Sequence, residues 1–521
     1  MARILSKKTL CMLMVVVFIL SLLLSGCGTG ANQQSTTAEN TTKEGTTAAI
    51  TEDKKELEFV HLKWYLPQPV PDMSHKDSVM AEVNRMFKEK INAELEFVFM
   101  DMNQFQEKMN IMSASGDPWD IALSGFTNNV TSNVSKGSCL AIDDLLNQYG
   151  QNILKLVADK FWPAVTYSGK RYAVINPLPY VMAKGAVVQK ELAEKYNLDT
   201  TSIKTLADLE PFLAAIKKNE PGIIPLGSFA TDQAPMMYNT IYDKLNTWLL
   251  YDTTDNKTKS ILDASWYVEQ FKVLVDYYKK GYIPKDASLK KDANTENKTK
   301  KYAVMCDPGS INDDGGVKAT SFNGFPCVEI NMGVMGMVGT SSVQTTLTLI
   351  GKNSKYPERS MMLINEMFGD KKLFNTMCYG LEGQDYKVVS GAGTDNPTVE
   401  ANAGDQQKWA IWHCWIGELN YNQWPSNWND EKTLEVYRKG NEEGKVSPIL
   451  GFIFDPEPIK TEVGQIDAII SEVMPILQTG SAPDLDKYVA DSKARMDKAG
   501  FLKVLAEVEK QLADWRKANG K

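Results

Sequence analysis

Tryptophans and amide side chains crowd one short stretch of this 521-residue chain. Five of its eleven tryptophans fall between residues 409 and 428, among Glu418, Tyr421, Asp430 and several asparagines. Aromatic faces stack on the apolar C–H faces of a sugar ring, and planar polar groups hydrogen-bond its hydroxyls. The stretch therefore has the chemistry to bind a sugar-like ligand. Burial of the same rings in a hydrophobic core is the alternative.

Three of these rings repeat at a helical spacing. Trp409, Trp412 and Trp415 stand at i, i+3 and i+6, so we predict that they share one broad side of a helix. So many bulky rings beside so many amides are difficult to bury together, and at least one should line a cleft. The candidates from this stretch are Trp412, Trp415 and Trp424.

Carboxylates allow a different chemistry. Two of them facing each other across a glycosidic bond would make the protein a hydrolase, and Glu382, Glu418 and Asp455 lie near aromatic stretches. The sequence places no two of them opposite each other. Hydrolysis is therefore the weaker alternative, and we expect no enzyme and no catalytic residue.

Metal and cofactor sites are not indicated. The chain has only three histidines, too few for most multi-histidine metal sites. Residues 251–260 (YDTTDNKTKS) are rich in aspartate but lack the ligand spacing, central glycine and final glutamate of an EF-hand loop. We expect a turn there, with no metal and no cofactor.

The first residues form a secretion signal. Arg3, Lys7 and Lys8 precede an apolar run from Thr9 to Leu24, which is shorter than the roughly 20 residues that span a bilayer. The run ends in Leu-Ser-Gly-Cys, which resembles the bacterial lipobox, where the chain is cut before the cysteine and lipid is attached to its thiol. We expect a signal peptide over 1–26, lipidation of Cys27, and a flexible Gly/Ser/Thr-rich tether over 27–56 at the extracellular face of a Gram-positive cell.

Charge and cysteine content narrow the partners further. The formal net charge of −8 becomes −11 when Arg3, Lys7 and Lys8 leave with the signal, so no nucleic acid partner is expected. After Cys11 and Cys27, an odd number of cysteines remains, without zinc-like spacing. We expect buried free thiols; a disulfide between Cys306 and Cys327 is the alternative.

Periodicity from residue 57 to residue 125 predicts alternating strands and helices. A strand ends at Trp64 and Tyr65, followed by a helix over 78–91, a strand over 95–100, a helix over 103–114 and a strand over 119–125. This order favours a parallel sheet, whose ligands bind outside the carboxyl ends of the strands. Trp64, Tyr65, Phe126 and Asn128 are therefore candidate binding residues.

A second unit begins near Gly169. It contains a helix over 188–196, a helix capped by Thr205 and kinked or divided near Pro211, a helix over 264–280 and a strand over 301–305. Tyr180 follows the chain's passage into this unit, and Asp307 follows the strand that leads back. Both are candidate binding residues near a hinge.

Several segments resemble one protein family. SGDPWDIALSG, GKRYAVINPLP and TLADLEPFLAAIKKNEPGIIPL are similar to bacterial extracellular solute-binding proteins of the sugar type (family 1). YGLEGQDYKVV, GFIFDPEPIKTEV and AGFLKVLAEVEKQLADW resemble the LipO-like branch, whose C-terminal region is DUF3502.

This resemblance implies a fold and a role. The fold would be α/β, a two-lobed periplasmic-binding-protein-like clamp (type II), each lobe a mainly parallel sheet flanked by helices. The first lobe would comprise 57–170 plus about 306–378, and the second about 171–305 plus 379–521. The protein would be a monomer that captures a carbohydrate, in particular an oligosaccharide, for the permease subunits of an ABC importer. The alternative role is a surface lipoprotein that senses a ligand for a membrane kinase.

Overall fold

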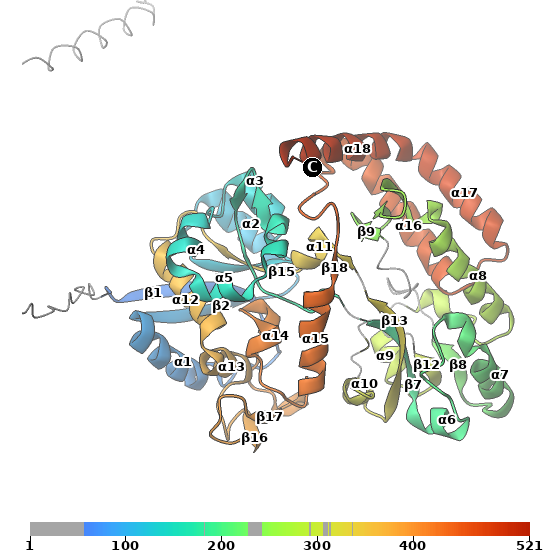
Figure 1. Ribbon diagram of the computed structural model, residues 1–521, viewed down its shortest axis with the longest axis horizontal. Coiled ribbons are helices and arrows are strands. Elements are labelled where there is room, and N and C mark those ends of the chain that lie inside the picture. The colour runs from blue at the N-terminus through green and yellow to red at the C-terminus, as the bar shows by residue number, and fades with distance from the viewer. Residues whose placement is uncertain are drawn as a thin grey trace, which may run out of the picture. The chain divides into compact units, whose positions relative to one another are not determined.

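A computed structural model describes residues 57–181, 183–227, 242–290, 293–305, 311, 314–335 and 337–520. Cys27, Cys306 and Asp307 lie outside these residues. Leu57–Lys521 forms one compact unit, within which the large hydrophobic cores define two lobes. Figure 1 shows how their helices and strands are arranged.

The first lobe is built on a five-stranded sheet in the order β2-β1-β3-β15-β6. Its strands are β1 (Val60–Pro67), β2 (Ala93–Met100), β3 (Ile121–Gly125), β6 (Val174–Ile175) and β15 (Thr346–Ile350). Strand β1 pairs in parallel with both β2 and β3, as the βαβ pattern predicted. Strand β15 runs antiparallel to β3 and β6, because it belongs to the part of the chain that returns from the second lobe.

Amphipathic helices pack with this sheet and bury their apolar sides in the same core. They are α1 (Lys76–Ile91), α2 (Phe105–Ser115), α3 (Val130–Lys136), α4 (Asp143–Tyr149), α5 (Gln151–Leu156), α12 (Pro357–Gly369) and α13 (Lys371–Tyr379). The helices predicted over 78–91 and 103–114 correspond to α1 and α2.

The second lobe has a four-stranded sheet in the order β13-β7-β12-β8. Its strands are β7 (Ala183–Gln189), β8 (Ile224–Gly227), β12 (Tyr302–Met305) and β13 (Cys327–Met335), and a smaller sheet holds β9 (Tyr242–Lys244), β10 (Leu249–Asp252) and β11 (Lys257–Ser260). Only β12 and β8 are parallel in the larger sheet, since β7 is antiparallel to both β12 and β13. Strand directions are thus more mixed than the mainly parallel sheets expected.

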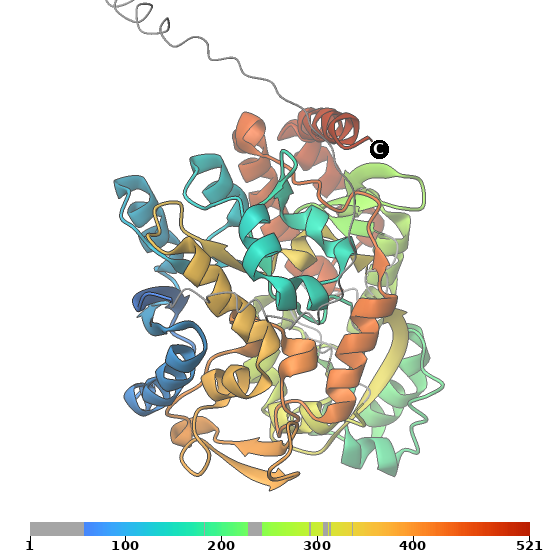
Figure 2. The ribbon, with the colours of Figure 1, turned by 60° about the vertical axis from the view of Figure 1, so that its left-hand side comes forward.

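Long helices complete the second lobe. They include α6 (Lys190–Lys195), α7 (Glu210–Asn219), α8 (Ser265–Lys279), α16 (Lys460–Gln478), α17 (Leu485–Lys498) and α18 (Phe501–Ala518). The three C-terminal helices, red in Figures 1 and 2, pack against one another, and α16 and α17 contact α8. Their apolar residues share the core of this lobe.

The cores divide the chain differently from the predicted lobe boundaries. Strand β6 and Val181 pack in the first core, although 171–181 was assigned to the second lobe. Strand β13 belongs to the second sheet, although it was assigned to the first lobe. Trp409 and Trp415 also pack in the first core, so the second lobe regains the chain only near Ile449. Sequence periodicity identifies elements, whereas the sheet that each one joins depends on contacts distant in sequence.

The helix cap and the helix break that the sequence predicted in the second lobe are both present. The Thr205 side chain and Asp208 form a capping box at a short 3-10 helix over Leu206–Leu209. Helix α7 begins immediately afterwards, with Pro211 in its first turn, where the missing N–H costs nothing. The predicted division near Pro211 is therefore confirmed.

Three of the described cysteines are free thiols, as the sequence predicted. They are Cys139, Cys378 and Cys414. Of the alternative disulfide between Cys306 and Cys327, Cys306 lies outside the described residues.

Residues 253–256 form the expected turn. Beside this turn, the Lys259 ammonium lies 3.1 Å from the Asp252 carboxylate and 2.7 Å from the Asp255 carboxylate. Within the described residues there is no cluster of three potential metal ligands. No helix in that same part of the chain is long and apolar enough to cross a membrane.

Candidate binding site

Three aromatic rings from distant parts of the sequence meet in the first lobe. Phe126 stacks on Trp415 with a centroid separation of 5.9 Å and an interplanar angle of 27°. Trp412 lies against the same indole at 4.8 Å and 43°. Trp415 is only 1% exposed, but Phe126 and Trp412 are 49% and 52% exposed. We call Phe126, Trp412 and Trp415 the aromatic platform.

The position of Phe126 follows from the end of β3. Gly125 closes the strand with a φ of +122°, and a Cβ on it would lie 2.2 Å from the Thr345 carbonyl oxygen. Glycine is therefore required for this close approach. The Phe126 N–H donates to the same carbonyl over 2.8 Å, which fixes the residue at the carboxyl end of a strand that has a parallel neighbour. This is the edge where binding residues were predicted.

Trp412 and Trp415 are not on an α-helix, so the prediction of a shared helical side was wrong. Only residues His413–Trp415 form a short 3-10 turn, and Trp412 precedes it in an extended conformation. The turn is closed by the Trp415 N–H, which donates to the Trp412 carbonyl over 2.8 Å. The tight turn brings the two rings together, with one facing solvent and the other facing the core.

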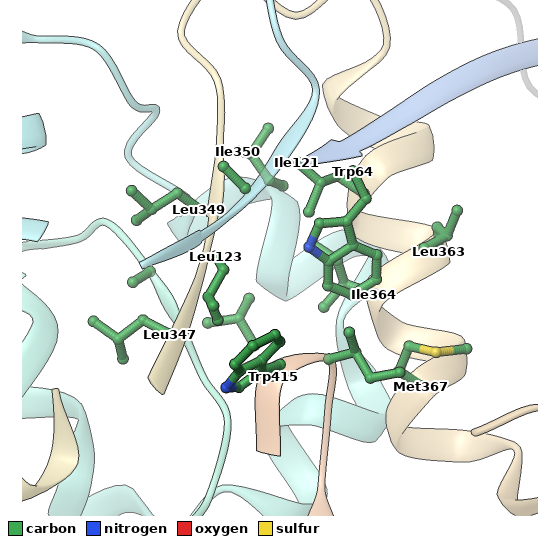
Figure 3. Packing of buried hydrophobic residues seen from close by; sticks show 14 of the residues in the cluster. Trp64, Ile121, Leu123, Leu347, Leu349, Ile350, Leu363, Ile364, Met367 and Trp415 are labelled. Atoms are coloured by element: carbon green, nitrogen blue, oxygen red, sulfur yellow. The ribbon is translucent and has the colours of Figure 1, made fainter. Parts of the chain in front are cut away.

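The core side of the platform is visible in Figure 3. Trp415 lies beside Leu123, Leu347 and Met367, which belong to the first core. Both exposed rings pack on this buried indole, which supports them from the core. The platform therefore offers preformed stacking surfaces.

Three candidate rings are buried instead. Trp64 is fully buried and packs on Phe97, because β1 continues to Pro67 and Trp64 points into the core (Figure 3). Tyr180 packs edge-on against Phe161 at 4.9 Å, and burial raises its phenol pKa. Trp424 is buried in a separate cluster. None of these rings has an open face in this conformation.

The other first-lobe candidates are also buried. Tyr65 is 7% exposed, and burial raises its phenol pKa, with a smaller contribution from the negative charges of Asp120 and Glu96. The Asn128 amide donates to the Leu123 carbonyl over 2.8 Å and accepts from Asn133 over 2.8 Å. It therefore shapes the loop after Phe126 from within. Asp307 lies outside the described residues.

Glu418 lies between Trp415 and Trp424 in the sequence. It is fully buried and caps α14 (Leu419–Asn422), accepting the backbone N–H groups of Asn420 at 3.0 Å and Tyr421 at 2.6 Å. Burial raises the pKa of Glu418 to about 7, although these two donors oppose the shift. A carboxyl group with no exposed surface is poorly placed to reach a glycosidic bond.

Asn176, whose buried side chain supports the platform, was not predicted from the sequence. Asn176, fully buried after β6, donates its side-chain N–H to the Trp415 carbonyl over 3.1 Å. An asparagine followed by Pro177 is a typical turn signal, and nothing in that signal indicates a contact with a residue 239 positions away.

The structure thus has two lobes, one of which carries the aromatic platform. Residues 448–517 match the family model DUF3502, a domain of unknown function. Over 463 residues the chain is 25% identical to a carbohydrate ABC transporter substrate-binding protein of Streptococcus pneumoniae serotype 4, covering 88% of this chain and 91% of that protein.

Solved structures show the same architecture. The N-glycan transport solute binding protein NgtS of Streptococcus pneumoniae is 23% identical, with a TM-score of 0.76 over 89% of this chain and all of the other. The Streptococcus pneumoniae substrate binding protein FusA, solved in complex with kestose, is 15% identical with a TM-score of 0.61, covering 88% of this chain and all of the other. The predicted resemblance is confirmed: the chain has the two-lobed fold of ABC-importer solute-binding proteins and carries the DUF3502 region.

Proposed function

We propose that the protein captures an oligosaccharide outside the cell and delivers it to the permease subunits of an ABC importer. The observation that carries the proposal is the aromatic platform, whose two open rings pack on a buried indole at the end of β3. Two or more exposed rings suit a ligand with several sugar units. The similarity to proteins named for N-glycan transport and solved with kestose supports the same ligand class.

The site residues take different roles in this proposal. Phe126 and Trp412 stack on the ligand, and Trp415 supports both rings. Trp64, Tyr65, Asn128 and Tyr180 act from the interior of the first lobe as supports, while Trp424 packs in a separate cluster. Asp307, which follows β12 in sequence, remains a candidate for hydrogen bonds to ligand hydroxyls.

We further propose that the protein works as a monomer anchored by lipid. Cleavage after residue 26 would leave Cys27 as the lipidated N-terminus, and 27–56 would tether the lobes at the extracellular face of the membrane. Labelling with a fatty-acid analogue, lost in Cys27→Ala, tests this anchor.

The ligand-binding proposal is tested by a matched pair of phenylalanine variants. Phe126→Ala removes an exposed ring at the carboxyl end of β3. Phe59→Ala removes one that is 38% exposed just before the amino end of the parallel strand β1. Titration calorimetry with N-glycan fragments and fructo-oligosaccharides should show affinity about tenfold weaker for Phe126→Ala, which corresponds to about 1.4 kcal/mol, and unchanged for Phe59→Ala.

Two results would contradict the proposal. One is the absence of binding by the wild-type protein across such a panel. The other is cleavage of the ligand during a long incubation, which would favour a hydrolase. Loss of oligosaccharide uptake in a deletion strain would distinguish transport from sensing for a membrane kinase.

A further inference from the structure

The buried amide of Asn176 joins three parts of the first lobe. Its side-chain N–H donates to the Trp415 carbonyl over 3.1 Å and to the Thr348 hydroxyl over 3.0 Å. The Thr348 hydroxyl lies 3.2 Å from the Asn176 side-chain oxygen. The Asn176 backbone N–H also donates to the Thr346 carbonyl over 3.2 Å. One side chain therefore connects β15 and the end of β6 to the centre of the platform.

The contact matters because Trp415 carries the other two rings. Phe126 and Trp412 both pack on its indole, so a displacement of the Trp415 backbone moves both stacking surfaces. The Trp415 carbonyl is buried near the sheet, where an unpaired acceptor would cost about 1–3 kcal/mol. Asn176 supplies its donor, and Thr348 holds the amide in the orientation that aims it.

The next residues keep Asn176 in place. The Asn441 side chain from α15 (Glu431–Glu443) donates to the Leu178 carbonyl over 2.6 Å and accepts from the Tyr180 N–H over 2.8 Å. The segment that leads from β6 towards β7 is thus bonded to α15 at two points. Asn176 is fixed by its hydrogen bonds to β15 and by the bonds of the segment that follows it. A residue that positions a ligand surface must be fixed in this way.

We propose that Asn176 is a positioning residue for ligand binding, which sets the stacking geometry of Phe126 and Trp412 through the Trp415 carbonyl. The inference rests on the proposed function. It adds a residue that touches no ligand and still determines affinity.

Asn176→Asp provides the test, because it keeps the size of the side chain and loses the N–H. At about pH 8 the buried carboxylate faces the Trp415 carbonyl and repels it, so oligosaccharide affinity should fall about tenfold or more. Burial raises the pKa of such a carboxyl. At about pH 5 its protonated form can again donate a hydrogen bond to the carbonyl, and affinity should recover. Glu418, whose pKa is raised by burial to about 7, titrates over the same pH range in every variant, so the readout is the ratio of variant to wild-type affinity at each pH.

Asn375→Asp is the matched control. Asn375 is also fully buried, and its side-chain N–H donates to another carbonyl of the Trp-rich stretch, that of Asn422, over 2.7 Å. It lies beside the buried Trp424, whose backbone N–H donates to the Asn375 side-chain oxygen over 2.9 Å. This variant should lower the melting temperature and leave the affinity of the folded protein unchanged.

The outcomes separate this inference from the proposed function. If the wild-type protein binds and Asn176→Asp binds equally well at about pH 8, the inference is wrong and the proposed function stands. Equal affinity losses in both asparagine variants would also overturn it, since they would indicate a general structural effect. If Asn176→Asp does not fold, Thr348→Val replaces it. Affinity several-fold weaker with little change in melting temperature is expected, and unchanged affinity would refute the inference.

Discussion

Two tryptophans of one tryptophan-rich stretch, Trp412 towards its start and Trp424 towards its end, differ in what surrounds them. At the start, Trp412 is half exposed and packs on Trp415. At the end, Trp424 is buried beside Tyr386, and its indole N–H donates to the Asp395 carbonyl over 3.1 Å. The residue type is the same at both ends. What differs is whether other elements cover the ring, so one tryptophan serves binding and the other serves stability.

The neighbours of each end explain the difference. The strands β16 (Tyr386–Ser390) and β17 (Thr398–Ala401) contribute Tyr386 and Val399 to the cluster around Trp424. Tyr379 in the same cluster receives a hydrogen bond from the Gln423 side chain over 2.9 Å. At the platform, Trp412 packs on Trp415 and remains half exposed. A half-exposed ring remains available to a ligand.

The largest effect is expected at the buried end. Trp424→Ala removes a large buried ring and leaves a cavity, so it should lower the free energy of unfolding by about 3–5 kcal/mol. Denaturant unfolding measures this loss. The affinity of the remaining folded protein should not change, and a specific loss of affinity would place Trp424 in the binding site.

The next largest change in stability is expected for Glu418, which lies between Trp412 and Trp424 in the sequence. Its folded pKa, about 7, is raised above the ordinary value of 4.5. The stabilisation from its protonated form is therefore complete below about pH 4.5 and is lost as the pH rises through 7, by up to about 3 kcal/mol. In Glu418→Gln this part of the pH dependence should disappear. Chemical denaturation at about pH 5 and about pH 8 measures it, and an unaltered difference between the two pH values would argue against a raised pKa.

The smallest free-energy change is expected at the exposed end, although its functional consequence is large. Trp412→Ala removes a half-exposed ring, so the free energy of unfolding should change by no more than about 0.5 kcal/mol. The loss of a stacking surface should weaken oligosaccharide affinity by about 2 kcal/mol, roughly thirtyfold. Calorimetric titration tests the affinity and denaturation tests the stability. A stable variant with wild-type affinity would remove Trp412 from the proposed site.

Sequence patterns predicted local structure well where the local chain carries its own signal. The alternation of strands and helices from β1 to β3 was predicted, as were the cap at Thr205 and the break at Pro211. The helical spacing of Trp409, Trp412 and Trp415 was misleading. Trp64 was expected at the end of a strand because a proline-rich loop follows, yet the strand continues to Pro67 and the ring points into the core.

The sequence by itself determined the alternation of α/β elements and the C-terminal region that matches DUF3502. These properties are encoded in short segments, whose composition and periodicity suffice to specify them. Only the tertiary structure decided which tryptophans are open, because exposure depends on the elements that pack over a ring. Phe126 and Trp415 are almost three hundred residues apart in the sequence, and the platform they form exists only where the end of β3 meets the turn at His413–Trp415.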